Sequence, residues 1–150
     1  WDQCKKFCDQ AKVNLPTEAQ WEYACKAGVT AAFNLGENIT TDQVNYDGNY
    51  PYTGPKGIYR KTTLKPGTLK SENAWGCYDF HGNVWEWCMD WAQEYPKEAQ
   101  KDPKGAEKGM CKILRGGSWM EYAQACRSAN RSKELPSSAS FQIGFRIVCD

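Results

Sequence analysis

One stretch decides the fold of this chain: Asn73-Ala-Trp-Gly-Cys-Tyr-Asp-Phe-His-Gly-Asn-Val-Trp-Glu-Trp-Cys-Met-Asp-Trp91. It holds four of the seven tryptophans, two of the eight cysteines and the only histidine. Its centre, residues 82–87, alternates aromatic and polar side chains, which is the period-2 pattern of a strand with one buried face. We therefore expect this stretch to form the structural centre, with Trp85 and Trp87 buried.

The composition indicates one globular domain. A chain of 150 residues is long enough to bury a core, and 13% aromatic with 25% charged residues is typical of a folded protein. Nineteen basic against eighteen acidic side chains leave a net charge of +1, which gives no electrostatic reason to expect nucleic acid as a partner. No apolar run approaches the roughly 20 residues of a membrane span, so we expect no direct membrane span.

The cysteines indicate the compartment. Eight are spread along the chain without a Cys-x-x-Cys pair, and with a single histidine this excludes the spacing of zinc fingers and zinc ribbons. Disulfides in an oxidising compartment are the better interpretation, and reduced buried thiols are the alternative. We therefore expect an extracytoplasmic or cell-surface location, reached through a lipoprotein or an N-terminal segment absent from this sequence.

Two helices are expected before the central stretch. Apolar residues recur at helical spacing over residues 1–12. Thr17-Glu-Ala-Gln20 then matches a capping box, which predicts a second helix that ends at Gly28. Residues 29–71 are rich in Gly, Asn, Asp and Pro, which predicts a long loop region.

Short strands are expected after the central stretch. Residues 112–119 read as a strand broken by a pair of glycines, and residues 120–142 are polar and irregular. A closing strand is expected over 144–149, with alternate residues from Phe145 onward on one face. Two helices followed by long loops and short strands predict an α+β fold in which loops outweigh regular structure.

Four motifs occur in a fixed order and cover nearly the whole chain. They are Leu15-Pro-Thr-Glu-Ala-Gln-Trp-Glu-Tyr-Ala24, Gly82-Asn-Val-Trp-Glu-Trp87, Arg115-Gly-Gly-Ser-Trp119 and Gly144-Phe-Arg146. The ordered set resembles the formylglycine-generating-enzyme (sulfatase-modifying factor) family, whose fold is a variant of the C-type lectin fold. The resemblance implies that residues 1–150 are a single domain of this type, without the N-terminal strand region of the family.

The resemblance has to be tested residue by residue before any activity is carried over. Oxidases of the family bind copper between two cysteines shortly after the Arg-Gly-Gly-Ser motif, and soft thiolates suit Cu(I). Here the first position falls at Glu121, which cannot replace a thiolate, and only Cys126 lies in the region. Ser118 matches an active-site serine of the oxidases. Another branch holds iron with three histidines, which His81 alone cannot provide. Copper and catalytic residues are therefore not expected.

Calcium is expected from the same resemblance. The matched ligands are side-chain oxygens of Asp79 and Glu86 and the backbone carbonyls of Gly82 and Val84, which are the hard oxygen donors that calcium prefers. The alternative is that the two carboxylates accept hydrogen bonds from backbone amides without an ion. A second calcium site of the family maps onto residues 45–58, where Lys56 replaces an acidic ligand and argues against binding.

The resemblance also suggests a disulfide pattern. Cys8 would pair with Cys149 and Cys25 with Cys126, and Cys88–Cys126 is a competing pair. His81 is expected to be a core or loop histidine that donates to a backbone carbonyl.

The segment 120–142 is the expected binding region. It resembles the variable region of proteins diversified by retroelements, although its Pro-Ser-Ser-Ala-Ser run is also similar to ordinary oxidase members. A mixture of aromatic, charged and small polar groups on loops suits adaptable recognition. The candidate ligand-binding residues are Met120, Glu121, Tyr122, Gln124, Ser132, Lys133, Glu134, Ser137, Ser138, Ser140 and Phe141.

The sequence therefore predicts a non-catalytic ligand-binding (display) module that binds a protein ligand on a cell or host surface. One alternative is a copper-dependent formylglycine-generating oxidase that acts on a sulfatase cysteine through an unrecognised thiol arrangement. The other is a structural domain of a larger protein.

Overall fold

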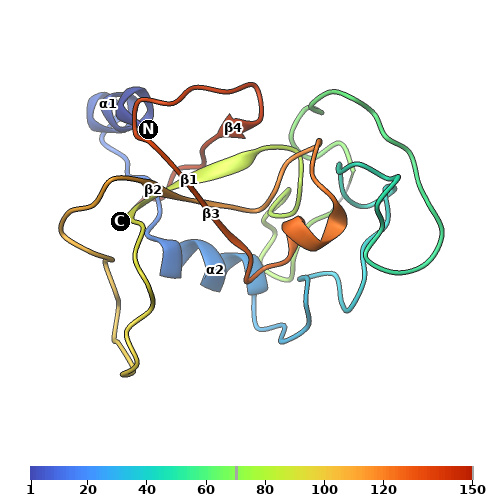
Figure 1. The fold of residues 1–150 in the computed structure, drawn as a ribbon, viewed down its shortest axis with the longest axis horizontal. Coiled ribbons are helices and arrows are strands. Elements are labelled where there is room, and N and C mark those ends of the chain that lie inside the picture. Colours follow the sequence, from blue (N-terminus) through green and yellow to red (C-terminus); the bar gives the residue numbers. More distant parts are fainter. Residues whose placement is uncertain (70, 150) are drawn as a thin grey trace.

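The computed structural model describes residues 1–69 and 71–149 (Figure 1). Its elements are α1 (Asp2–Ala11), α2 (Glu18–Lys26), β1 (Trp85–Trp91), β2 (Lys112–Arg115), the 3₁₀ helix η1 (Ala123–Cys126), β3 (Arg131–Glu134) and β4 (Ile143–Gly144). The strands form one sheet in the order β3-β2-β1-β4, in which only the β1–β4 pair is parallel. Long loops fill the side of the molecule away from α1. The expected α+β fold is confirmed.

Strand β1 is the centre of the sheet, and both of its faces are covered. Trp85 and Trp87 pack in the same cluster as Cys8 of α1. On the opposite face, Cys88 packs with Trp21 of α2. The expected burial of the two tryptophans is confirmed, but the expectation of a single buried face is wrong. The second face is buried because α2 packs against it, which also takes the polar side chains between the tryptophans out of water.

Both expected helices are present. The Thr17 hydroxyl accepts a hydrogen bond from the Gln20 amide at 3.2 Å, and the Gln20 side chain accepts one from the Thr17 amide at 2.8 Å. This capping box therefore starts α2 as the sequence predicts. The helix ends at Lys26, two residues earlier than expected, and the left-handed conformation begins at the C-cap Ala27 and continues at Gly28. No helix in the described ranges is both long and apolar enough to cross a membrane.

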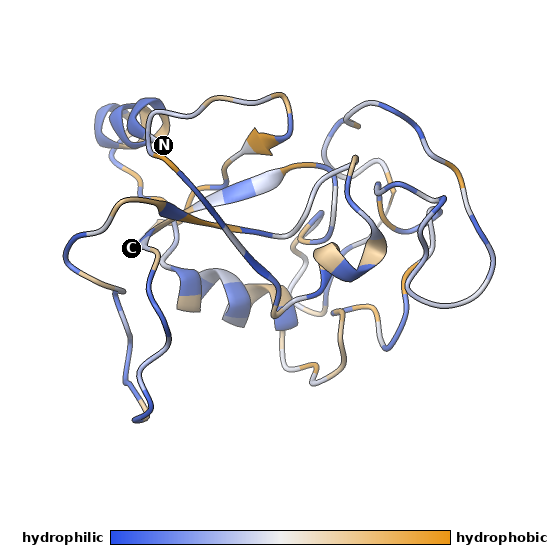
Figure 2. Cartoon of the chain, viewed as in Figure 1, coloured by the Kyte–Doolittle hydropathy of each residue, from blue (hydrophilic) through white to orange (hydrophobic). Residues whose placement is uncertain are grey.

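The C-terminal half differs from the prediction. Only Ile143–Gly144 pairs with β1, and Val148 forms an isolated bridge with Asn14. Phe145, Ile147 and Cys149 are exposed, so the expected strand over 144–149 is wrong in its extent. Segment 120–142 is more regular than expected, since it contains η1 and β3. Strand β3 escaped detection because its sequence, Arg-Ser-Lys-Glu, is wholly polar (Figure 2), as suits a solvated edge strand.

The long loop region packs through a core of its own. Phe33, Ile39, Val44 and Tyr46 form a buried cluster with Ala123 and Cys126 of η1. The loop is tied to the central stretch at Gly82, because the Asn83 amide donates to the Asn45 carbonyl at 2.8 Å. A Cβ at Gly82 would lie 2.3 Å from that carbonyl oxygen, so the close approach requires glycine.

All eight cysteines lie in the described ranges, and all are free thiols in this structure. The expected Cys8–Cys149 and Cys25–Cys126 disulfides and the competing Cys88–Cys126 pair are therefore not formed. Cys8 is fully buried whereas Cys149 is exposed. The His81 ring lies between the other expected pair, with Nε2 3.9 Å from the Cys25 sulfur and Nδ1 2.7 Å from the Cys126 carbonyl oxygen.

Arg115 joins the sheet to α2 in the interior. Its side chain is fully buried, and Nη2 donates to Glu22 at 2.5 Å while Nη1 lies 3.4 Å from Glu18. The guanidinium also donates to backbone carbonyls of residues 128–130 at 2.7–3.3 Å. Glu18 in turn accepts two hydrogen bonds from Arg131 of β3, at 2.6 and 2.7 Å. The first turns of α2 are thus fixed to two strands.

We expect Arg115→Ala to lower the free energy of unfolding by about 3–5 kcal/mol, because it leaves the buried Glu18 with Arg131 as its one cation and the carbonyls of residues 128–130 without their donor. The control is Lys5→Ala, which removes the exposed Lys5–Asp9 pair of α1 and should change the free energy by less than about 0.5 kcal/mol. Urea unfolding of both variants measures the difference. A loss below about 1 kcal/mol for Arg115→Ala would contradict this account.

Candidate ligand-binding site

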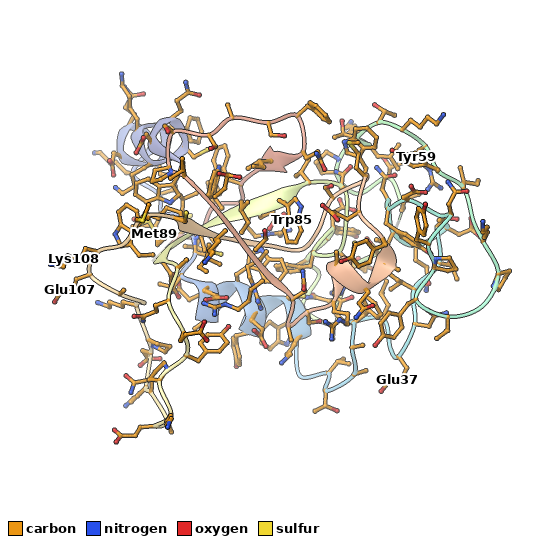
Figure 3. All side chains as sticks on the ribbon, viewed as in Figure 1. Glu37, Tyr59, Trp85, Met89, Glu107 and Lys108 are labelled. Carbon is orange, nitrogen blue, oxygen red and sulfur yellow. The ribbon has the colours of Figure 1, made fainter. Side chains whose placement is uncertain are left out.

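A row of aromatic side chains marks the candidate site. The rings of Tyr59 and Trp119 stack with centroids 6.0 Å apart, and those of Trp119 and Phe141 lie 5.9 Å apart. Phe141 is 70% exposed and Met120, next to Trp119, is 41% exposed. Tyr59 is labelled in Figure 3 on the long loop region. We call Tyr59, Trp119 and Phe141 the aromatic row. Aromatic side chains that gather at a surface, as the exposed Phe141 and the half-buried Tyr59 and Trp119 do here, are typical of interaction surfaces.

The aromatic row rests on a hydrogen-bonded frame. The buried Ser118 hydroxyl donates to the Gln142 side chain at 2.8 Å and accepts from the Met120 amide at 3.3 Å. The Trp119 amide donates to the Asn83 carbonyl at 3.0 Å. The residue before Trp119 and the residue after Phe141 are therefore linked directly. In this structure Ser118, which matches a catalytic serine of the oxidases, connects the two segments that carry the row.

The structure separates the predicted ligand-binding residues. Those beside or within the aromatic row are Met120, Glu121 and Phe141. Tyr122 and Gln124 line a hollow with Tyr50. Ser132, Lys133 and Glu134 belong to the edge strand β3. Ser137, Ser138 and Ser140 line a different hollow, near Trp1. The residues do not share one surface because the segment runs from β3 at one edge of the sheet to β4 at the other.

Two members of the aromatic row were missed by the sequence prediction. Tyr59 is sixty residues away from Trp119 in the chain, in a region without periodicity. Trp119 follows the glycine pair of the Arg-Gly-Gly-Ser motif, and that position was assigned to a strand. The sequence did contain one indication of Trp119: it is an aromatic residue close behind the glycine pair that interrupts the strand, where a side chain can leave the sheet.

The described cysteines provide no thiolate pair at this site. Glu121, which the family resemblance places near the first copper position, has its carboxylate 3.5 Å from Nε1 of Trp85. Cys126 is fully buried, and burial raises the pKa of its thiol far above the ordinary value. Burial likewise raises the pKa of Cys25 to about 12. Both groups are therefore protonated thiols at neutral pH in the protein without a bound ion.

Glu86, one of the expected calcium ligands, is engaged by protein donors. Arg146 donates to both carboxylate oxygens, at 2.5 and 2.7 Å, and Trp21 Nε1 donates at 2.6 Å. An ion at Glu86 would have to replace Arg146. No group of three or more His, Cys, Asp or Glu side chains in the described part of the chain is arranged to hold a metal ion. The donors to Glu86 are side chains, whereas the expected alternative to an ion was hydrogen bonding from backbone amides.

The other expected calcium ligands lie on the turn before β1. The Asp79 carboxylate accepts from the Gly67 amide at 2.6 Å, and the Ser71 hydroxyl lies 3.4 Å from its other oxygen. Gly82 is buried, and the Val84 side chain lies next to the backbone of Gly144.

Asn45, in the region of the second calcium site of the family, has one unusual feature. Its side chain is 3% exposed, and Nδ2 donates to the Thr62 carbonyl at 2.9 Å and to Asn83 at 3.1 Å. Its Oδ1 atom is buried without a hydrogen-bond partner among the described residues. A buried oxygen of this kind could face a cation, but Lys56 remains an unfavourable neighbour in that region.

His81 is a core histidine, as expected. Its Nδ1 donates to the Cys126 carbonyl at 2.7 Å, and its Nε2 accepts from the Asn34 amide at 3.0 Å. Burial lowers the pKa of His81 to about 4, so the ring is neutral at pH 7. Both nitrogens are occupied by backbone groups, which leaves neither free for catalysis.

We expect acidification to destabilise the protein through His81. The folded-state pKa of about 4 lies below the unfolded value of 6.5, so the unfolded state binds more protons between these values. This contribution is fully present above pH 6.5 and is lost as the pH falls towards 4, by about 3 kcal/mol in all. Urea unfolding between pH 7 and 5 measures it, and His81→Gln should flatten the dependence. A histidine NMR titration near pH 6.5 in the folded protein would contradict the prediction.

Comparison with known proteins shows the family to which this chain belongs. The sulfatase-modifying factor enzyme 1-like domain matches residues 1–150, so the chain belongs to the formylglycine-generating-enzyme-type sulfatase-modifying family, with its C-type lectin-like fold. The formylglycine-generating enzyme of Mus musculus is 34% identical over 161 residues, which cover 100% of this chain and 42% of that enzyme.

Two solved structures extend the comparison. Treponema denticola variable protein 1 has a TM-score of 0.75 and 29% identity, over 90% of this chain and 46% of that one. PvdO from Pseudomonas aeruginosa has a TM-score of 0.70 and 26% identity, over 90% of this chain and 51% of that one. This chain therefore spans about half the length of the proteins it resembles.

Proposed function

We propose that this chain is a non-catalytic ligand-binding module that presents the aromatic row to a protein ligand on a cell or host surface. The observation that carries the proposal is an aromatic row, with Phe141 70% exposed, on a frame built around the buried Ser118. Similarity to a protein named variable protein 1 supports a role in display. We place the module in an extracytoplasmic or cell-surface setting.

The hydrogen-bonded frame suits ligand binding because the residues that hold the backbone in place are different from the residues that would contact a ligand. Ser118 and Gln142 hold the two segments, whereas Met120 and Phe141 project into solvent. Substitution of exposed side chains usually changes stability by less than about 0.5 kcal/mol. The contact residues can therefore differ without loss of the fold.

A copper-dependent oxidase is the competing function, supported by 34% identity to the mouse formylglycine-generating enzyme. Incubation with copper, oxygen and a cysteine-containing sulfatase peptide separates the two. We expect no formylglycine, because no thiolate pair faces Ser118 among the described residues. Mass spectrometry of the peptide measures the product, with an active family oxidase as positive control. Formylglycine formed by this protein would contradict the binding-module proposal.

A display library gives the same proposal a positive test. Met120, Glu121 and Phe141 are randomised, and the library is selected on yeast against lysozyme as a model protein ligand. We expect folded binders whose melting temperatures stay close to that of the parent. A matched library at Ser118, Asn83 and Gln142 should yield mostly unfolded variants. Loss of folding in the first library would contradict the proposal.

The proposal includes calcium at Asp79, Gly82, Val84 and Glu86, where the ion would exchange with Arg146 on Glu86. Addition of calcium to protein treated with a chelator is then expected to raise the melting temperature, because binding to the folded state alone is stabilising. The double variant Asp79→Ala, Glu86→Ala should lose this increase, and the exposed-acid variant Glu37→Ala should retain it. Absence of any calcium effect on the parent protein would end this part of the proposal.

A further inference from the structure

A second hollow lies where the loop around Tyr50 meets the start of η1. It has a volume of about 400 Å³ and is separate from the aromatic row. We call it the tyrosine groove, and its lining residues are Asn49, Tyr50, Pro51, Tyr52, Tyr122 and Gln124. None of these lining side chains is charged, although charged residues make up 25% of the chain.

The backbone of the tyrosine groove is held in place by the protein itself. The Asp47 amide donates to the Glu121 carbonyl at 2.9 Å, and the Ala123 amide donates to the Tyr50 carbonyl at 3.1 Å. The Tyr52 ring packs edge-on against the buried Phe33, with centroids 5.1 Å apart. A ligand therefore meets a preorganised surface, which lowers the entropy cost of binding.

Two of the lining tyrosines expose much of their apolar ring surface to water. Tyr50 is 62% exposed and Tyr122 is 52% exposed, yet both belong to the same hollow. Large amphipathic rings with few rotatable bonds are typical anchors of protein recognition. Their clustering indicates a surface that is used for binding.

The lining restricts the chemistry of the ligand. Without a charged side chain, the tyrosine groove complements an uncharged ligand. The Asn49 side chain is bound to Asp47, so the Gln124 amide and the tyrosine hydroxyls are the polar groups left to face a ligand. These groups can donate hydrogen bonds to carbonyl oxygens.

A polyproline II segment has the matching properties. Its proline rings are flat and apolar, its carbonyls point outward as acceptors, and it has no N–H at proline that would need an acceptor. Aromatic-lined grooves recognise such segments because their extended shape is formed before binding. We propose that the tyrosine groove binds a proline-rich, extended and uncharged segment of the protein partner. This inference rests on the proposed function, since it assigns one part of the partner to Tyr122 and Gln124.

An NMR titration of the ¹⁵N-labelled protein tests the proposal, with acetylated decaproline as the probe. We expect saturable shifts confined to residues 47–53 and 121–125. A glycine-serine peptide of equal length is the control, and methyl mannoside is the competing ligand class. Equal shifts with the glycine-serine peptide, saturation by the mannoside alone, or no shift with decaproline would each overturn the proposal.

Variants locate the binding within the tyrosine groove. Tyr50→Ala and Tyr122→Ala should each weaken decaproline binding about tenfold or more, as loss of an anchor residue does. Gln124→Glu places a charge at an exposed lining position and should weaken binding while the protein stays folded. The control is Tyr23→Ala, at an exposed tyrosine of α2 outside the groove, which should leave binding unchanged. If the single variants Gln124→Glu and Tyr122→Ala both bound decaproline with wild-type affinity, the assignment of binding to the tyrosine groove would be overturned.

The outcome is distinguishable from the test of the proposed function. Failure of decaproline with successful selection of lysozyme binders at Met120, Glu121 and Phe141 removes the proline-rich ligand and keeps the binding module. Formylglycine production removes the binding module whether or not decaproline binds.

Discussion

Arg115 is the side chain on which the rest of the structure depends. Its buried guanidinium meets Glu18 and Glu22 of α2 on one side and the carbonyls of residues 128–130 on the other. The sheet, the second helix and the backbone that leads into β3 are therefore fixed by one group. A buried charge of this kind is costly to separate from its partners, so it specifies how these elements pack.

This interior arrangement leaves the loops to carry recognition. Strand β1 is buried on both faces between α1 and α2, and the long loop region packs through its own cluster around Phe33 and Tyr46. Exposed aromatic side chains on a rigid framework need little ordering when a ligand binds. The aromatic row and the tyrosine groove are two such surfaces, and each combines two residues of segment 119–141 with the long loop region.

Sequence analysis was most successful where local chemistry decides the structure. The capping box at Thr17, the buried tryptophans and the break at the glycine pair after β2 were all predictable, because they depend on neighbouring residues. Strand β3 was not, since a polar edge strand has no hydrophobic period. The expected strand at the C-terminus was too long because the alternation of Phe145 and Ile147 belongs to an exposed segment.

The sequence by itself determined the family and the α+β fold, because both follow from residue identity and order. Only the tertiary structure decided which side chains meet. It brought Tyr59 beside Trp119, placed Tyr50 and Tyr122 along one hollow, paired Arg146 with Glu86 and left the thiols unpaired. These contacts join segments far apart in the chain. They are set by packing against a shared core, and no local pattern encodes them.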